Sequence, residues 1–282
     1  MPRPCSFADY ASGVSGYDDI ADGYARHWGP VIRPAAEAVL DLLPAGVGSD
    51  LHLLDVGTGT GALAIAALER WPQLRVTGID PSQGMLDLAS RTAEARLSAP
   101  VRDHLTFVLG DAAELPVEGA SVDLVVSSFV LQLLDRRAAA MREARRVLRP
   151  GGTFAWVAWL AGEAPFRGDE VANEVLDHYG FDPPEPGARG GEPPSPAVAA
   201  AATRRAGFSD VRAHEAALVH AWTPDSYLAF FTEFDETSLF EDLDRTERRR
   251  ITQAIGLQLR RLSAEELTMR LPTVYVTGRV RR

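Results

Sequence analysis

Short apolar runs alternate with amphipathic segments along the first half of the chain, and this alternation predicts its architecture. Aliphatic and β-branched runs predict strands at residues 51–56, 75–80, 104–109, 122–127 and 152–159. Apolar residues at helical spacing predict helices at about 61–70, 82–97 and 135–148. Strands that alternate with helices require crossover connections, so the pattern indicates an α/β fold with a parallel sheet.

The segment before the first strand has a different pattern. Residues 17–43 show helical apolar spacing that Gly29, Pro30 and Pro34 interrupt. Proline lacks a backbone N–H and disfavours the helix interior. We therefore expect two lead-in helices with a break between them.

The regular alternation ends after Trp159. Residues 182–196 contain too many prolines and glycines for regular structure, so we expect a loop that can cover a site. A helix at about 196–206 and a strand at 208–219 follow, and TVYVTGRV at 273–280 reads as a closing strand. Between these two strands we expect a charged helical insertion at about 223–269.

This pattern divides the chain into three parts. Residues 1–45 are expected to form lead-in helices, and 46–160 an α/β core. Residues 161–282 are expected to complete the sheet, with a helical cap insertion at about 219–270.

The sequence LLDVGTGTGALA at 53–64 marks the junction of a strand, a glycine loop and a helix. Glycine at 57, 59 and 61 lets backbone approach a ligand, because glycine has no Cβ to clash. The helix that follows presents unpaired N–H groups to a polar ligand. The junction predicts a site for a nucleotide-like cofactor.

Composition narrows the class of protein. The net charge of −10 disfavours nucleic-acid binding, and all 29 basic residues are arginine, which excludes lysine chemistry such as Schiff bases. A lone cysteine, Cys5, excludes an internal disulfide. We expect no metal site, no membrane span and a cytoplasmic location, since no run reaches the roughly 18 to 20 apolar residues of a membrane helix and no signal peptide is visible. The oligomeric state is left open.

The glycine loop alone does not identify the cofactor. Gly57, Gly59 and Ala62 fit the dinucleotide pattern G-x-G-x-x-A as well as the looser pattern of methyltransferases. Asp80 ends the second strand, where an acid accepts hydrogen bonds from ribose in both cofactor classes. Asp80 could instead cap the helix that starts at Pro81.

Two further acids favour one cofactor. Asp55 lies two residues before Gly57, where an anion suits a ligand with an ammonium and a sulfonium group and repels a pyrophosphate. Asp111 follows the third strand, where a carboxylate can accept from an adenine amino group. Asp111 is also typical of a turn or a helix cap.

The motifs LLDVGTGTGALA, VTGIDPSQGMLDLA, FVLGDAAELPVEGASVDLVVSSFVLQLL and EARRVLRPGGTFAWVAW occur in this order. Together they resemble a class I S-adenosylmethionine-dependent methyltransferase of the ubiquinone/menaquinone methyltransferase-like branch, with a methyltransferase type 11 domain. The resemblance covers residues 17–160 and weakens beyond them. It implies a Rossmann-like, doubly wound seven-strand sheet, mostly parallel with an antiparallel last strand. It also implies that residues 1–45 form lid helices over the cofactor and that 46–160 form the Rossmann-like core that binds it.

The resemblance also implies which residues contact the cofactor. It assigns the methionine end to the glycine loop, the ribose to Asp80, the adenine face to Gln83 or Met85, and the adenine edge to Asp111. It places Tyr24 at the cofactor carboxylate, although Tyr24 and Trp28 could be ordinary core aromatics. The full set expected at the cofactor is Tyr24, Asp55, Gly57, Thr58, Gly59, Gly61, Asp80, Pro81, Gln83, Met85, Gly110, Asp111, Ala112, Ser127, Ser128 and Phe129.

The expected reaction is transfer of the methyl group to a small-molecule O, C or N nucleophile in an apolar pocket under the cap. The donor is already activated, so alignment in a dry pocket can supply much of the catalysis. If a general base acts, the candidates are His178, His220 and Glu233, with His214 and Asp235 behind them. The fourth-strand loop SSFVLQLLD lacks the His pair or cysteines of many relatives, which disfavours a thiol-ligated metalloid substrate.

Two alternatives remain open. The protein could bind S-adenosylmethionine for a reaction without methyl transfer, or as a sensor. It could also be an NAD-dependent oxidoreductase, although Asp55 and Asp111 disfavour a pyrophosphate-bearing cofactor.

Overall fold

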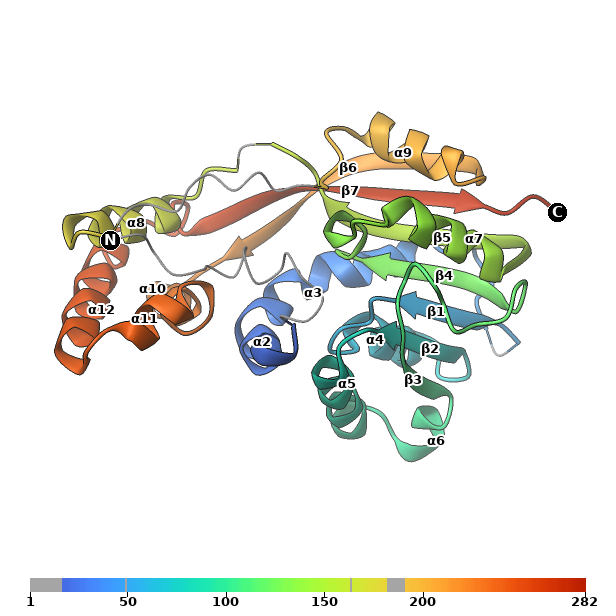
Figure 1. Ribbon diagram of the computed structural model, residues 1–282, viewed down its shortest axis with the longest axis horizontal. Helices are drawn as coiled ribbons and strands as arrows, with labels where there is room; N and C mark the ends of the chain where they lie inside the picture. Colours follow the sequence, from blue (N-terminus) through green and yellow to red (C-terminus); the bar gives the residue numbers. More distant parts are fainter. Residues whose placement is uncertain (1–16, 49, 163, 182–190) are drawn as a thin grey trace.

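The computed structural model describes residues 17–48, 50–162, 164–181 and 191–282. Within these ranges the chain forms a seven-stranded sheet of order β3-β2-β1-β4-β5-β7-β6 (Figure 1). All neighbouring pairs from β3 to β5 are parallel, and β7 pairs antiparallel with both β5 and β6. The predicted fold class is therefore confirmed. The strands are β1 (His52–Val56), β2 (Arg75–Asp80), β3 (Leu105–Leu109), β4 (Val122–Ser128), β5 (Leu148–Trp159), β6 (Ser209–Ala221) and β7 (Thr268–Arg279).

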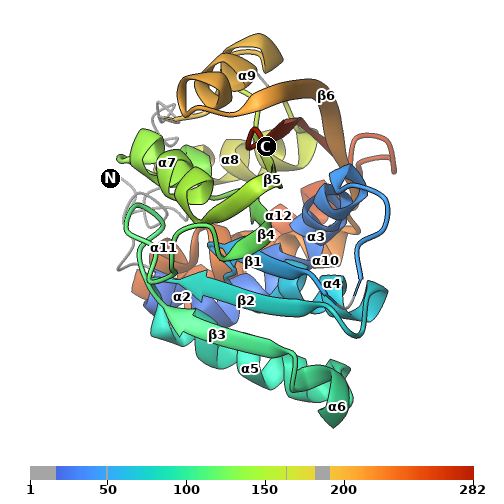
Figure 2. The ribbon, with the colours of Figure 1, turned by 90° about the vertical axis from the view of Figure 1, so that its right-hand side faces the viewer.

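Helices cover both faces of the sheet, so the parallel strands are buried on both sides (Figure 2). Leu53 packs in a cluster with α3 (Gly29–Glu37) and α4 (Ala62–Arg70). Its neighbour Leu54 packs in a second cluster with α7 (Arg137–Val147) and α9 (Pro196–Arg205). Successive strand residues point to opposite faces, which explains why these strands are apolar throughout. The remaining core helices are α5 (Gln83–Arg96), α6 (Ala99–Arg102) and the 3-10 turn η4 (Leu131–Leu133).

The predicted break in the lead-in segment is wrong. The chain stays helical through α2 (Tyr17–Gly23), the π-helical turn η2 (Tyr24–Trp28), α3 and the 3-10 turn η3 (Ala38–Leu42). The N–H of Gly29 donates to the carbonyl of Tyr24, five residues back, so the helix widens ahead of Pro30. Pro30 then lies in the first turn of α3, where a missing N–H costs little.

Strand β5 begins earlier than predicted. The sequence predicts a strand at 152–159, but the ladder already starts at Leu148 and runs through Arg149, Pro150 and Gly151. Gly151 adopts φ +85°, and the pairing of β4 with β5 shifts register between Val122 and Leu124. An irregular ladder therefore accommodates the turn residues.

Strands β6 and β7 continue well beyond the sheet as a two-stranded ribbon (Figure 1). Strand β7 begins at Thr268 rather than at 273, because its first residues pair with the end of β6, up to Ala221. The segment between them, residues 222–267, is the cap. Its helices are α10 (Pro224–Phe230), the π-helical turn η5 (Phe231–Asp235), α11 (Thr237–Asp242) and α12 (Arg245–Leu259).

The helix α8 (Arg167–His178) packs against α12, so part of the chain outside the insertion supports the cap. At the other end, α2 lies between α5 of the core and η5 of the cap. Residues 182–190 of the expected loop and Cys5 lie outside the described residues. No helix in the described ranges is long and apolar enough to span a membrane.

Candidate cofactor and acceptor site

The predicted cofactor residues lie along one edge of the sheet, where β1, β2, β3 and β4 end. The N–H of Gly110, just after β3, donates to the carbonyl of Asp80 at 3.0 Å. The Ser127 hydroxyl donates to the carbonyl of Val56 at 2.8 Å, which ties β4 to β1. The strand order reverses between β1 and β4, and ligands of open α/β sheets bind outside such a switch point.

The glycine loop, residues 57–61, needs its glycines for two different reasons. Gly57, Gly59 and Gly61 all adopt positive φ, at +73°, +53° and +77°. A Cβ on Gly57 would lie 2.2 Å from Cγ2 of Val130, so this glycine permits close packing of the loop against the chain after β4. A Cβ on Gly59 would meet no atom within 4 Å. Gly59 therefore presents bare backbone to open space, as a ligand cradle requires.

Asp80 organises this loop through its carboxylate. Its Oδ2 accepts from the N–H of Gly59 at 2.8 Å, and its Oδ1 accepts from the N–H of Ser82 at 3.0 Å. Ser82 is the N-cap of α5, and its hydroxyl accepts from the N–H of Met85. The alternative that Asp80 caps a helix starting at Pro81 is therefore wrong, because Ser82 is the cap and α5 starts at Gln83. Asp80 instead accepts from the N–H of the cap residue and holds the glycine loop. Its proposed contact with ribose stays a prediction.

Asp55 is fully buried at the end of β1. Its Oδ2 accepts from the Thr58 hydroxyl at 2.8 Å, whereas its Oδ1 accepts no hydrogen bond from any described residue. Burial raises the pKa of Asp55 to about 7, and nearby Asp80 adds to the rise, while Thr58 and the N–H of Ala64 oppose it. A buried carboxylate with an unused oxygen is suited to a cationic ligand group.

The residues expected around adenine differ in accessibility. Asp111 is exposed, its Oδ1 accepts from the N–H of Ala113 at 2.8 Å, and Arg136 lies 3.9 Å from its Oδ2. Ala112 beside it is buried. Of the two candidates for the adenine face, Met85 is buried, whereas the exposed Gln83 donates to Asp87. Pro81, which precedes the cap of α5, is exposed.

The end of β4 has an unusual backbone. Ser127 is buried and Ser128 is partly exposed. Phe129 follows with φ +56°, a strained value for a residue with a side chain, and its ring stacks on Trp159 at 4.1 Å between centroids. The side-chain amide of Gln132 donates to the carbonyl of Phe129 at 2.7 Å. Neither Gln132 nor Trp159 was among the predicted site residues, although Trp159 ends β5 at this same edge.

A chain of aromatic contacts leads from Phe129 into the cap. Trp28 of η2 lies 6.2 Å from Trp159 and 5.5 Å from Phe230 of α10, measured between ring centroids. Phe230 lies 5.1 Å from Trp222. We call these five residues the aromatic bridge. The predicted cofactor residue Tyr24 packs beside the bridge, edge-on to Phe234 of η5 at 6.4 Å.

The structure does not bring the three candidate bases together. His178 is exposed at the end of α8, the helix that lies beside α12 at the left end of the molecule in Figure 1. His220 lies near the end of β6, 4.4 Å from the ring of Trp222, and burial lowers its pKa. Glu233 is exposed and lies 3.4 Å from Nε2 of His27, a residue that the sequence patterns did not single out. Burial lowers the pKa of His27, although Glu233 opposes this.

The secondary candidates lie elsewhere. His214 of β6 stacks on Tyr275 of β7 within the seven-stranded sheet, and Asp235 ends η5. Tyr227 of α10 donates to Asp169 at 3.3 Å, and burial raises its pKa well above the usual value. Among the described residues no group of three or more His, Cys, Asp or Glu side chains is arranged to hold a metal ion.

A glycine loop at the switch point of an open α/β sheet, with acids at or just after the ends of three successive strands, is typical of a site for a nucleotide-like cofactor. Residues 54–156 match the family model of the methyltransferase domain. Over these residues the chain is similar to methyltransferase domains.

Named relatives agree with this assignment. The chain is 43% identical over 154 residues to the ubiquinone/menaquinone biosynthesis C-methyltransferase of Paracoccus denitrificans, covering 55% of this chain and 58% of that protein. It is 37% identical over 146 residues to the malonyl-[acyl-carrier protein] O-methyltransferase of Geobacter sulfurreducens, covering 52% and 50%. The chain thus spans little more than half the length of the curated relatives it matches.

A solved structure supports the fold. Phosphoethanolamine N-methyltransferase 2 of Haemonchus contortus, in complex with S-adenosylhomocysteine, aligns with a TM-score of 0.57 and 18% identity, over 100% of this chain and 62% of that one. Over the matched region, these comparisons agree with the predicted methyltransferase class and its S-adenosylmethionine cofactor. The comparisons lend no support to the alternatives of a non-transferring protein or an oxidoreductase.

Proposed function

We propose that the chain transfers the methyl group of S-adenosylmethionine to a small molecule held between the carboxyl edge of the sheet and the cap. The observation that carries this proposal is the glycine loop, where Gly59 faces open space while Asp80 fixes its N–H. Asp55, one strand end away from Asp80, adds a buried anion for the ammonium group of the cofactor. Bound S-adenosylmethionine supplies an activated methyl group.

In this proposal the predicted cofactor residues bind different parts of S-adenosylmethionine. Gly57, Thr58, Gly59 and Gly61 hold the methionine end, and Asp80 accepts from the ribose hydroxyls with lone pairs that its two backbone bonds leave over. On the adenine side, Met85 supports the ring from within α5 while Asp111 accepts from its amino group. The other residues expected there are Pro81, Gln83, Gly110 and Ala112.

The acceptor side is apolar. Phe129 and Trp159 stack at the end of β4 and β5, and Trp28 and Phe230 continue the aromatic surface into the cap. Such a surface excludes water and aligns an apolar acceptor with the sulfonium, which is where much of the rate of an in-line displacement originates. Ser127 and Ser128 lie beside it on β4.

We assign no obligatory base. His220 and Glu233 both belong to the β6–cap region, and either can take a proton from a hydroxyl or acidic carbon if the acceptor requires it. His178 stands on the outer helix α8, so its role depends on an acceptor that reaches that far. The chemical identity of the acceptor and the cytoplasmic location stay predictions.

Calorimetry with S-adenosylhomocysteine tests the cofactor site. We expect Asp80→Ala to weaken binding by about tenfold or more, because two backbone N–H groups lose their acceptor and the glycine loop loses its anchor. His178→Ala is the matched control and should leave affinity unchanged. Equal effects of the two substitutions would count against the proposed site.

Labelled S-adenosylmethionine, incubated with the protein and a metabolite extract, tests the reaction. Transfer predicts one labelled product, identified by mass, for each demethylated cofactor formed. Cofactor binding without demethylated product would instead favour the sulfonium-assisted or sensor alternative. A spectral shift on addition of NADH would favour the oxidoreductase.

A further inference from the structure

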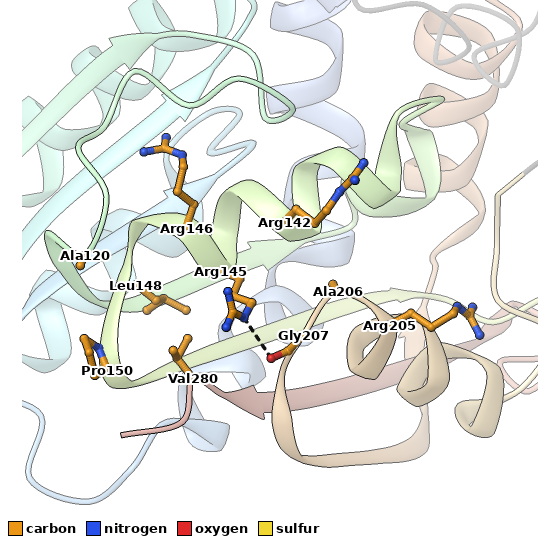
Figure 3. Close-up of a pocket in the computed structure, with 10 residues that line it drawn as sticks. All are labelled: Ala120, Arg142, Arg145, Arg146, Leu148, Pro150, Arg205, Ala206, Gly207 and Val280. Carbon is orange, nitrogen blue, oxygen red and sulfur yellow. Dashed lines mark hydrogen bonds between the residues drawn. The ribbon is translucent and has the colours of Figure 1, made fainter.

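A cavity lies at the opposite edge of the sheet from the glycine loop. It has a volume of about 580 Å³ and opens between the last turns of α7 and α9 (Figure 3). Its walls carry Arg142, Arg145, Arg146 and Arg205, and its floor includes Leu148 and Val280. The strand ends here are those where β4 and β5 begin, so the cavity is separate from the proposed cofactor site.

Two of these arginines have structural partners. Arg146 pairs with Glu143 at 2.7 Å and donates to the carbonyl of Leu115. Arg145 reaches across the cavity and donates to the carbonyl of Gly207 at 3.0 Å, which ties α7 to the end of α9 (Figure 3). These contacts explain Arg145 and Arg146 as ordinary supports of two helix ends.

The other two arginines have no such explanation. The guanidinium of Arg142 donates only to the carbonyl of Ala138 in its own helix, and the side chain of Arg205 forms no hydrogen bond or ion pair with any described residue. They stand on different helices toward the same end of the cavity, and Arg145 lies on the side of them that faces Pro150 at the far end (Figure 3). None of the residues lining the cavity is acidic.

This concentration of charge is unusual for the chain. The protein as a whole carries a net charge of −10, yet four arginines line one cavity without a carboxylate in its lining. The carboxyl ends of α7 and α9 each contribute roughly half a negative charge, and Glu143 adds one more. The positive charge of the four guanidinium groups exceeds this negative charge. The excess positive charge is spread over two helices, so the cavity suits an anion long enough to bridge them.

We propose that this cavity binds a small molecule that carries a diphosphate group. Planar guanidinium groups bind phosphoryl oxygens in bidentate fashion. Two linked phosphoryl groups can engage Arg142 and Arg205 at the mouth together with the outer nitrogens of Arg145. Nucleic acid is a poorer occupant, because the long-range field of the acidic chain repels an extended polyanion.

Calorimetry with inorganic pyrophosphate, added to protein saturated with S-adenosylhomocysteine, tests the proposal at low ionic strength. The saturated cofactor site cannot then account for the heat. We expect one site, with affinity reduced at least about tenfold in the double variant Arg142→Ala with Arg205→Ala. The matched control is Arg245→Ala with Arg249→Ala, which removes the same charge from exposed positions of α12 and should leave affinity within about twofold.

Thermal unfolding and S-adenosylhomocysteine binding establish that each variant is folded. If the alanine pair does not fold, the single reversal Arg205→Glu serves in its place, since the Arg205 side chain lies in the last turn of α9 and forms no hydrogen bond or ion pair with a described residue. Absence of pyrophosphate binding, equal losses in both double variants, or equally tight binding of orthophosphate would each overturn the proposal.

Discussion

At the scale of single residues, Gly57 and Gly59 adopt similar left-handed conformations but face different surroundings. Gly57 is packed against Val130, whereas Gly59 faces open space where we propose that the methionine end of the cofactor binds. One glycine therefore serves packing and the other serves access. Alanine at each position separates the two roles.

We expect Gly59→Ala to fold, with a loss of about 1–2 kcal/mol from the left-handed conformation, and to lose most of its affinity for S-adenosylhomocysteine. The added methyl group would occupy the space where the ligand approaches. Gly57→Ala should instead lower the melting temperature far more, because its Cβ would lie 2.2 Å from Val130. Thermal unfolding and calorimetry on both variants check this, and a Gly59→Ala protein with unchanged affinity would contradict the cradle.

Asp55 makes stability depend on pH in a predictable direction. Its pKa rises from 3.8 to about 7 on folding, because the carboxyl is buried. Between these values the folded chain holds a proton that the unfolded chain has lost, so the free energy of unfolding falls as pH rises. We expect Asp55→Asn to abolish this decrease in the free energy of unfolding, which is on the order of 1–4 kcal/mol. Unfolding at pH 4 to 8 measures it, and parallel curves for the two proteins would refute it.

The same carboxyl should couple cofactor binding to proton release. An ammonium group beside Asp55 lowers its pKa, so near pH 7 the bound cofactor expels part of a proton. The apparent binding enthalpy of S-adenosylhomocysteine should then vary with the ionisation enthalpy of the buffer. Asp55→Asn should bind more weakly and show no such variation. Buffer-independent enthalpy in the parent chain would argue against this.

At the scale of elements, the link from β4 to α7 holds the acceptor side of the site. Phe129 leaves β4 in a left-handed conformation, and Gln132 in η4 secures its carbonyl. The ring of Phe129 is thereby set against Trp159 at the end of β5. The side-chain amide of Gln132 thus fixes the backbone after β4, and with it the position of the Phe129 ring against β5.

Replacing Gln132 by Met should keep the shape of the buried side chain and remove the hydrogen bond. We expect a loss of about 1 kcal/mol or more in the free energy of unfolding. Affinity for S-adenosylhomocysteine should be retained, while turnover falls because Phe129 is released from its strained position. Urea unfolding and single-turnover assays distinguish the two effects, and unchanged turnover would show that Gln132 matters for stability alone.

How far the sequence predicts each element depends on whether its cause is local. The strands β1 to β4 and the helices between them follow from apolar periodicity and glycine turns, and their residues converge at one edge because parallel strands end there. The helical path through Pro30 and the early start of β7 at Thr268 do not follow, because a π-turn and a distant partner strand cause them. Gln132 escaped notice since its role depends on the conformation of Phe129.

At the scale of the whole molecule, Trp28 connects three parts. It contacts Trp159 of the sheet and Phe230 of the cap from a position on the lead-in helices. The hydrophobic core accordingly runs without interruption from α3 and α4 into the cap. We expect the cap and the core to open together rather than as independent units.

Trp28→Ala should uncouple the cap. We expect faster hydrogen exchange in α10, η5 and α11, with little change in β1 and β4, because the substitution removes the ring between Phe230 and Trp159. The control Trp71→Ala removes a partly buried tryptophan that packs under Arg70 at the end of α4. It should leave exchange in the cap unaltered, and identical exchange patterns in the two variants would contradict the coupling.

The paired ends of the β6–β7 ribbon have an evolutionary consequence. Ala221 and Thr268 are partners in the ladder, so residues 222–267 leave and re-enter the sheet at one point. A single continuous stretch of gene therefore encodes this region, and an exchange of that stretch leaves every strand of the cofactor half in register. Descendants of one ancestral enzyme can acquire new acceptors by replacing this module while inheriting the same methyl donor.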